Sequence, residues 1–301
     1  MLPVLLAKIK TRDGITLDGI IIEPRRKSKT ALIWIHGLTS YFYSSPTLIR
    51  ELSQLCQKNG IGYFKFNTRG HDIVARGQGN KKLLGTTYEK FEDCVYDIRA
   101  MILFARKRGY KNIILTGHST GANKALYYTY KTRDRTVKGI ILLGPVSDIA
   151  YDTKLLGGKE LQKRIARVKR LKSRNPALLV PPQYGIYTTR RYLSLLLPGM
   201  PEDVFPYHNP NTKWKELRSV KTPLAVIFGS RDQYLDRPAQ KIIEIFQKNT
   251  IPTRRNFLKK NLGGQAKSFS GIIIKDADHS FRKKEKELAR VIMEWVKTNG
   301  L

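Results

Sequence analysis

A serine lies between two glycines in the motif Gly117-His118-Ser119-Thr120-Gly121, which follows the apolar run 113–115 and precedes a helical pattern beginning at Ala122. This is the pattern G-x-S-x-G at a strand-to-helix turn, which holds a serine hydroxyl above the end of a sheet. The serine takes a strained backbone conformation in such a turn, and side chains at the flanking positions would collide with the neighbouring strand and helix. We therefore expect Ser119 to be a nucleophile.

A serine hydroxyl needs a base to remove its proton during attack, and that base is usually a histidine oriented by a carboxylate. Of the five histidines, only His279 follows the last predicted strand, in a loop ahead of the final helix. Asp232 follows the strand before it, so serine, acid and histidine come in the chain order typical of this turn. We predict Ser119, Asp232 and His279 as the catalytic residues, with Asp236 and the weaker Asp148 as rival acids.

The negative oxygen that forms during such an attack needs two preorganised N–H donors. One is expected from the backbone of Thr120, directly after the nucleophile. The other is expected from the loop 36–40, where Gly37 lets the backbone fold close to a substrate. We predict the Leu38 N–H as this second donor, with Thr39 as the alternative.

Strand and helix patterns alternate along the chain and must position these residues. Alternating apolar residues at 4–11 and 15–22 meet across Asp13-Gly14, a hairpin-type turn. Further strands are predicted at 31–35, 61–66, 112–115, 137–143, 224–228 and 271–274, and helices at 46–58, 88–108, 122–130, 239–247 and 284–298. The pattern predicts an α/β fold with a mostly parallel, doubly wound sheet of about eight strands. Ligands bind at the carboxyl edge of such sheets.

The alternation stops between about Ser147 and Lys221, after the sixth strand, in a stretch that contains several prolines. We interpret 147–221 as a lid inserted into a single domain that spans 1–301. Within it, residues 159–174 place Leu161, Ile165 and further apolar side chains on one helical stripe and lysines and arginines on the remainder.

The motifs together resemble those of the α/β-hydrolase superfamily over essentially the whole chain. The resemblance rests on His36-Gly37, the turn 67–71, the serine motif and the Asp232–His279 order. A narrower resemblance, to siderophore-esterase-like hydrolases of fungi, rests on the serine motif and on Gly144-Pro145-Val146-Ser147-Asp148. It implies hydrolysis of an ester in an iron-chelating or similar polar acyl compound.

The chain is strongly basic, with 56 Lys and Arg against 24 Asp and Glu and a net charge of +32. Such an excess attracts anions, although a generally basic surface explains it equally well. For the basic stretch 159–174, three interpretations stay open. The first is a solvated helix packed on the core, and the second is a cationic rim that draws in an anionic substrate. The third is a docking surface for nucleic acid or an anionic membrane.

No apolar run approaches the roughly 18 residues needed to cross a bilayer, and the first residues do not read as a secretion signal. Cys56 and Cys94 each lie on an apolar helical face, which predicts buried free thiols in a reducing cytoplasm. We therefore expect a cytoplasmic protein. No metal and no organic cofactor are expected, and the oligomeric state stays open.

The pattern as a whole predicts a serine hydrolase that cleaves a carboxylic ester of a small molecule through an acyl-enzyme. Cleavage of a thioester, an amide or a carbon–carbon bond would use the same residues and stays open. A non-catalytic module that binds nucleic acid or membrane through the basic stretch is the alternative from another class. Arg69 and His71 are interpreted as braces of a turn rather than as substrate contacts, and His118 as a packing residue.

Overall fold

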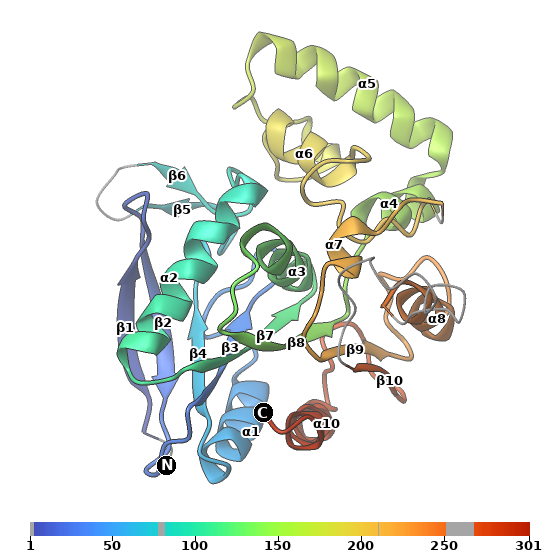
Figure 1. The fold of residues 1–301 in the computed structure, drawn as a ribbon. Helices are drawn as coiled ribbons and strands as arrows, with labels where there is room; N and C mark the ends of the chain where they lie inside the picture. Colours follow the sequence, from blue (N-terminus) through green and yellow to red (C-terminus); the bar gives the residue numbers. More distant parts are fainter. Residues whose placement is uncertain (1–2, 78–81, 210, 251–267) are drawn as a thin grey trace.

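A computed structural model describes residues 3–77, 82–209, 211–250 and 268–301. Its main feature is an eight-stranded sheet with the order β1-β2-β4-β3-β7-β8-β9-β10 (Figure 1). The strands are β1 (Leu5–Lys10), β2 (Thr16–Ile22), β3 (Thr30–Ile35), β4 (Gly62–Phe66), β7 (Asn112–His118), β8 (Val137–Leu143), β9 (Leu224–Gly229) and β10 (Phe269–Ile274). β2 pairs antiparallel with β1 and β4, and the remaining pairs are parallel. The predicted α/β fold is confirmed.

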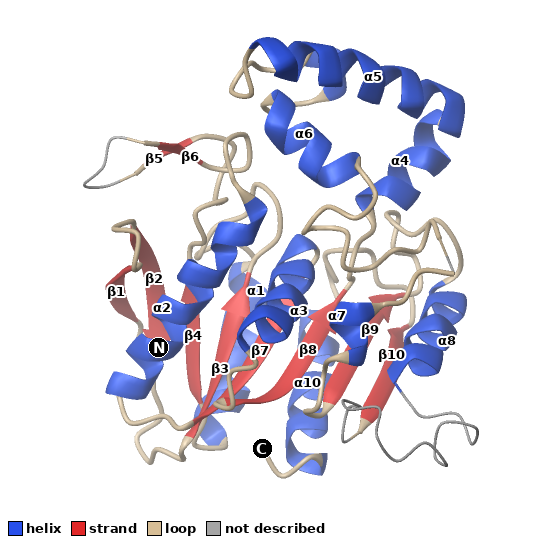
Figure 2. Cartoon of the chain, turned by 45° about the horizontal axis from the view of Figure 1, so that its top comes forward, coloured by secondary structure: helices blue, strands red, loops and turns tan. Residues whose placement is uncertain are grey.

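Helices cover both faces of the sheet (Figure 2). One face carries α1 (Pro46–Lys58) and α10 (Glu285–Thr298), which pack on β3, β8 and β9. The other carries α2 (Cys94–Lys107), α3 (Thr120–Thr132) and α8 (Ala239–Thr250). The inner strands are buried on both sides, which explains their continuous apolar sequences.

The strand β8 leads into a helical segment, residues 148–218, before the chain returns to the sheet in β9. It contains α4 (Asp148–Leu156), α5 (Gly158–Arg174), η2 (Pro182–Tyr184), α6 (Thr189–Leu196) and α7 (Lys215–Arg218). Its helices α4, α5 and α6 stand beyond the carboxyl ends of the strands, with α5 outermost (Figures 1 and 2). The amphipathic helix predicted at 159–174 is α5, one residue longer.

Two local features differ from the sequence prediction. The helix predicted at 88–108 begins later, because a 3-10 turn, η1 (Phe91–Asp93), precedes α2. The short hairpin of β5 (Ala75–Arg76) and β6 (Leu83–Leu84) was not predicted, because two-residue strands have no readable pattern.

Cys56 and Cys94 are buried free thiols, as predicted. Burial raises the pKa of each thiol far above its ordinary value. Of the helices that the structure describes, none is both long and apolar enough to cross a membrane. In the same residues no group of three or more histidines, cysteines and carboxylates is arranged to hold a metal ion.

Candidate active site

Ser119 stands alone between the end of β7 and the start of α3, with φ 56° and ψ −129°. This backbone conformation is strained for a residue with a side chain. A Cβ on Gly117 would lie 2.2 Å from the Gly121 carbonyl oxygen, and a Cβ on Gly121 would lie 2.2 Å from the Ile35 carbonyl oxygen. The two glycines are therefore required by backbone packing, which is the reason predicted from the motif.

His279 and Asp232 meet after β10 and β9. The His279 Nδ1 lies 2.8 Å from the Asp232 Oδ2, and both residues are buried. The Tyr234 backbone N–H donates to the other Asp232 oxygen at 3.0 Å, and the Tyr234 ring packs 4.6 Å from the imidazole. An ionised carboxylate only accepts hydrogen bonds, so the Nδ1 of His279 carries the proton. Its Nε2 is thereby left as a hydrogen-bond acceptor.

The end of β8 lies between the serine turn and the histidine. The Ser119 N–H donates to the Leu143 carbonyl oxygen at 2.9 Å. A Cβ on the next residue, Gly144, would lie 3.0 Å from the His279 Nδ1 and 3.2 Å from the Asp232 Oδ2. The structure therefore gathers the three predicted catalytic residues at one edge of the sheet, although they are far apart in sequence.

His118, the neighbour of the serine, holds the histidine loop in place. Its Nε2 donates to the His279 carbonyl oxygen at 2.8 Å, and the two rings lie 5.0 Å apart. Burial, together with the neighbouring imidazole of His279, lowers the pKa of His118 to about 4. A neutral, half-buried imidazole with this bond has a packing role, as predicted.

The loop after β3 approaches the serine closely. A Cβ on Gly37 would lie 2.8 Å from the Ser119 Cβ and 3.3 Å from its Oγ. The Thr39 N–H donates to the Thr86 Oγ1 at 2.8 Å, so it is already occupied. Among the described residues, neither the Leu38 N–H nor the Thr120 N–H has an acceptor. This geometry favours the Leu38 amide over the Thr39 amide as the second donor.

His36 braces this loop. Its Nε2 accepts the Thr68 backbone N–H at 2.9 Å, and its Nδ1 donates to the Gly37 carbonyl oxygen at 2.8 Å. Burial keeps the pKa of His36 well below its usual value, so the ring stays neutral and fills both roles. The loop conformation thus depends on a side chain whose function the motif alone did not indicate.

The rival acids have other partners. The Asp236 carboxylate pairs with Arg237 at 2.6 Å. Asp148 is the first residue of α4, and burial beside the Glu202 carboxylate raises its pKa to about 8. Of these aspartates, only Asp232 is hydrogen-bonded to His279. The geometry therefore favours Asp232.

Arg69 is a brace, as predicted. Its buried guanidinium pairs with Asp97 of α2 and with Asp13 of the first hairpin, each at 2.8 Å. His71 lies 2.8 Å from its neighbour Asp72. The bonds of Arg69 join the turn after β4 to two distant elements.

A buried cluster of four charged residues was missed by sequence reasoning. The Lys124 Nζ of α3 lies 2.5 Å from the Glu89 carboxylate. Arg191 of α6 contacts Glu89 at 3.4 Å and pairs with both oxygens of Glu202. All four side chains are fully or almost fully buried. We call them the buried charge cluster; it joins the sheet body to the helical segment.

A small polar cavity of about 20 Å³ lies beside His118 and is lined in part by Lys65, Ser44 and Ser280. It has room for about one water molecule. The buried Lys65 Nζ donates to the Ser44 carbonyl oxygen at 2.6 Å, and burial lowers the pKa of this lysine to about 7.

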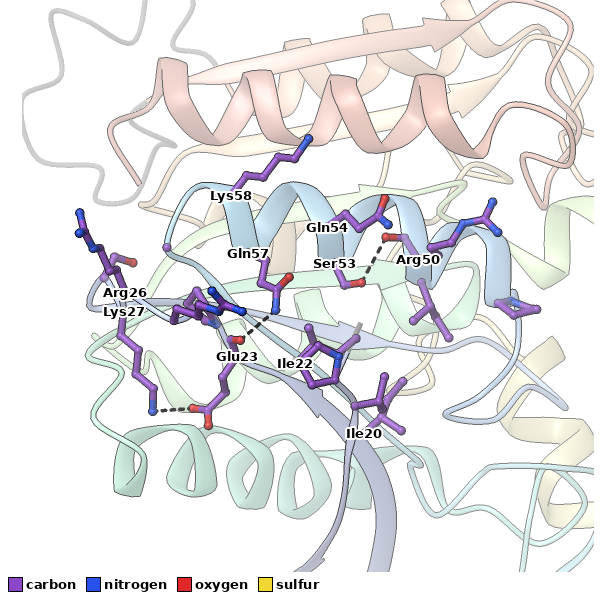
Figure 3. Close-up of a pocket in the computed structure, with 18 of the residues that line it drawn as sticks. Ile20, Ile22, Glu23, Arg26, Lys27, Arg50, Ser53, Gln54, Gln57 and Lys58 are labelled. Carbon is purple, nitrogen blue, oxygen red and sulfur yellow. Dashed lines mark hydrogen bonds and ion pairs between the residues drawn. The ribbon is translucent and has the colours of Figure 1, made fainter. Parts of the chain in front are cut away.

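A much larger hollow lies elsewhere on the described surface. It is an open groove of about 1630 Å³ between α1 and the strand β2 (Figure 3). Ile20 and Ile22 lie along its floor, and Arg26 and Lys58 are among the cations at its rim. None of the three predicted catalytic residues lines it, so its size does not mark the site of chemistry.

The fold is shared with solved hydrolases. The chain is similar to the esterase Pf2001 of Pyrococcus furiosus, with 18% identity over 99% of this chain and 91% of that one and a TM-score of 0.62. It is also similar to Est1E of Butyrivibrio proteoclasticus bound to ferulic acid, with 17% identity over 97% of this chain and 99% of that one and a TM-score of 0.65. A third is the siderophore hydrolase EstB of Aspergillus fumigatus, with 18% identity over 99% of this chain and 97% of that one and a TM-score of 0.65.

These identities are low, so the likeness establishes the α/β-hydrolase fold and leaves the reaction to be argued from the site. No curated protein matches the sequence. Residues 3–298 match a family described as a protein of unknown function, DUF1749. The chain therefore belongs to the DUF1749 family and has an α/β-hydrolase fold.

Proposed function

We propose that the protein is a serine hydrolase that cleaves a carboxylic ester through an acyl-enzyme. The observation that carries this proposal is the buried His279–Asp232 pair at 2.8 Å, at the same sheet edge as the strained Ser119. The carboxylate fixes the imidazole with its proton on Nδ1, so Nε2 is available as the base. A strained serine beside such a base has no purpose in a module that only binds.

The reaction would proceed in two halves. His279 takes the Ser119 hydroxyl proton through Nε2 while the Oγ attacks the ester carbonyl, and the Leu38 and Thr120 amides stabilise the resulting oxyanion. The imidazolium then gives its proton to the leaving alcohol. Water, deprotonated by the same histidine, attacks the acyl-enzyme and releases the carboxylic acid.

We further propose that residues 147–221 act as the lid of the site. Leu38, beside the serine, packs against an apolar cluster formed by side chains of α5 and α6. An acyl group at Ser119 would therefore meet an apolar surface on the side of the lid. The aromatic residues Tyr184 and Tyr187 border this cluster and would suit an acyl group with a ring.

The substrate class rests on the site and on analogy with the neighbours. One structural neighbour binds ferulic acid and another is a siderophore hydrolase. For this chain we propose an ester of a small acyl compound, with an iron-chelating acyl group as the first candidate. Thioesters and amides belong in the same assay, because the proposed residues would attack them as well.

Labelling with a fluorophosphonate probe tests the proposal. The purified protein should be labelled, and the Ser119→Ala variant should not. Ser147→Ala is a matched control that removes a different hydroxyl at the same sheet edge and should still be labelled. A folded wild-type protein that fails to react, both with the probe and with a panel of esters, would overturn the proposed function.

A further inference from the structure

The outer face of α5 carries a row of cations. Leu161, Ile165 and Val168 are buried against α6, so the opposite side of the helix faces solvent. Five exposed side chains follow one another along that side at spacings of three or four residues: Lys159, Lys163, Arg167, Arg170 and Arg174. A rise of 1.5 Å per residue separates neighbours in the row by about 4.5 to 6 Å along the axis. We call these five residues the cation row.

No carboxylate neutralises the cation row among the described residues. Glu160 is the one acid of α5, and it pairs with Arg164, which is outside the row. Like charges three or four residues apart on a helix repel each other and destabilise it. An anionic surface laid against the helix would remove this repulsion.

A turn with exposed apolar side chains lies beside the row. The Val180 N–H donates to the Tyr187 carbonyl oxygen at 2.9 Å, which closes residues 180–187 into a narrow loop. Leu178 and Leu179 come directly before this loop and Ile186 lies within it; these side chains are 41%, 54% and 39% exposed. We call these three residues the apolar tip.

Tyr184 fixes the turn against α5. Its ring lies 4.7 Å from the Arg164 guanidinium and 5.9 Å from that of Arg167, a member of the row. The loop that carries exposed leucine and isoleucine residues is thus held against α5, the outermost helix of the segment (Figure 1).

We propose that the cation row and the apolar tip form a docking surface for an anionic lipid bilayer. The cations would contact the charged headgroups, and the apolar tip would enter the interfacial layer. The apolar side of α5 is already used against α6, so the helix itself would rest on the surface without inserting. A nucleic acid would satisfy the cations, but its phosphate backbone offers nothing to the apolar tip.

The proposal is separate from the proposed reaction, because it concerns binding and is measured without turnover. It uses vesicles of phosphatidylcholine with and without phosphatidylserine, in a sedimentation assay at increasing salt. The wild-type protein should bind the anionic vesicles, with affinity that falls as salt rises, and should leave neutral vesicles nearly unbound.

The row variant Lys163→Glu/Arg170→Glu/Arg174→Glu should lose at least about 100-fold in affinity, since each basic residue near an anionic surface contributes about a factor of five. The matched control Arg25→Glu/Arg26→Glu/Lys58→Glu changes the net charge equally at exposed residues of the Figure 3 groove. It should retain most of the affinity. Both variants are first checked for the wild-type melting temperature.

A second variant tests the apolar tip. Leu178→Ser/Leu179→Ser/Ile186→Ser should weaken vesicle binding by about tenfold or more, while the remaining binding stays salt-sensitive. Three results would overturn the proposal: equal loss in the row and control variants, no effect of the apolar variant, or row-dependent binding of duplex DNA or RNA without binding of vesicles.

Discussion

The serine turn and the helical segment above it are held in place by different forces. At the turn, backbone atoms and glycines approach so closely that a single Cβ would lie 2.2 Å from a carbonyl oxygen. The helical segment is fastened to the body by the buried charge cluster, in which long side chains from four separate places meet. The first region is specified locally by a five-residue motif, and the second by partners that only the fold brings together.

The difference should appear when each region is changed. Substitutions of the proposed catalytic side chains that add no bulk should alter turnover and leave stability nearly intact, because few buried contacts are lost. Variants in the buried charge cluster should alter stability first.

The largest effect is expected from Asp232→Asn. An amide would let His279 adopt the wrong tautomer, and kcat should fall by about 10⁴-fold. KM and the melting temperature should change little, which distinguishes a positioning role from a structural one. Asp236→Asn is the matched control and should retain activity. If Asp236→Asn is the inactive variant, the acid has been assigned wrongly.

Arg191→Met tests the buried charge cluster. The change leaves Glu89 and Glu202 with less neutralising charge in the interior, and the free energy of unfolding should fall by about 3 to 5 kcal/mol. Chemical denaturation followed by circular dichroism measures this loss. The neighbouring Arg190 is exposed, so Arg190→Met should stay near the wild type. Adding Glu202→Gln to Arg191→Met should recover part of the loss, because one of the unneutralised carboxylates is then removed.

Gly37→Ala is expected to act on turnover through the oxyanion donors. The added methyl would lie 2.8 Å from the Ser119 Cβ and would displace the loop that carries the Leu38 amide. Loss of one such donor lowers kcat by about 10² to 10³-fold. Gly158→Ala on α5, where a Cβ meets nothing within 4 Å, should leave kcat unchanged. Full activity of Gly37→Ala would exclude this loop from the reaction.

Lys65→Met is expected to give the smallest effect, a change in melting temperature whose size depends on pH. The folded lysine has a pKa of about 7, and the unfolded one about 10.4. Between these values the unfolded chain binds a proton that the folded chain does not, so the lysine makes stability rise with pH. The gain in melting temperature from Lys65→Met should therefore be largest at or below pH 7 and shrink toward pH 10. Lys58→Met, at an exposed site, should show no such trend.

The sheet and its edge could be predicted because their residues obey short-range rules. Continuous apolar runs marked the strands, and the motif around Ser119 marked the strained turn between β7 and α3. Asp232 and His279 followed from chain order alone. The Leu38 amide could not be separated from that of Thr39, since the decision rests on Thr86, 47 positions away.

The helical segment could not be predicted to the same depth. Only α5, with 17 residues, is long enough to repeat its apolar stripe over several turns, whereas α4, α6 and α7 have nine, eight and four residues. Arg191 and Glu202 look like ordinary surface residues in the sequence, yet both are buried. Glu89, which the sequence pattern placed in a helix, instead belongs to the buried charge cluster ahead of α2.

The buried charge cluster also determines how the protein can be engineered. A truncated sheet body without residues 148–218 would leave Glu89 without its Arg191 partner and open to solvent, so it is a poor candidate for a minimal enzyme. A helical segment grafted from a relative would have to bring its own arginine and glutamate at matching positions. Swapping of this segment between family members is therefore restricted to donors whose segment places an arginine and a glutamate where Arg191 and Glu202 stand.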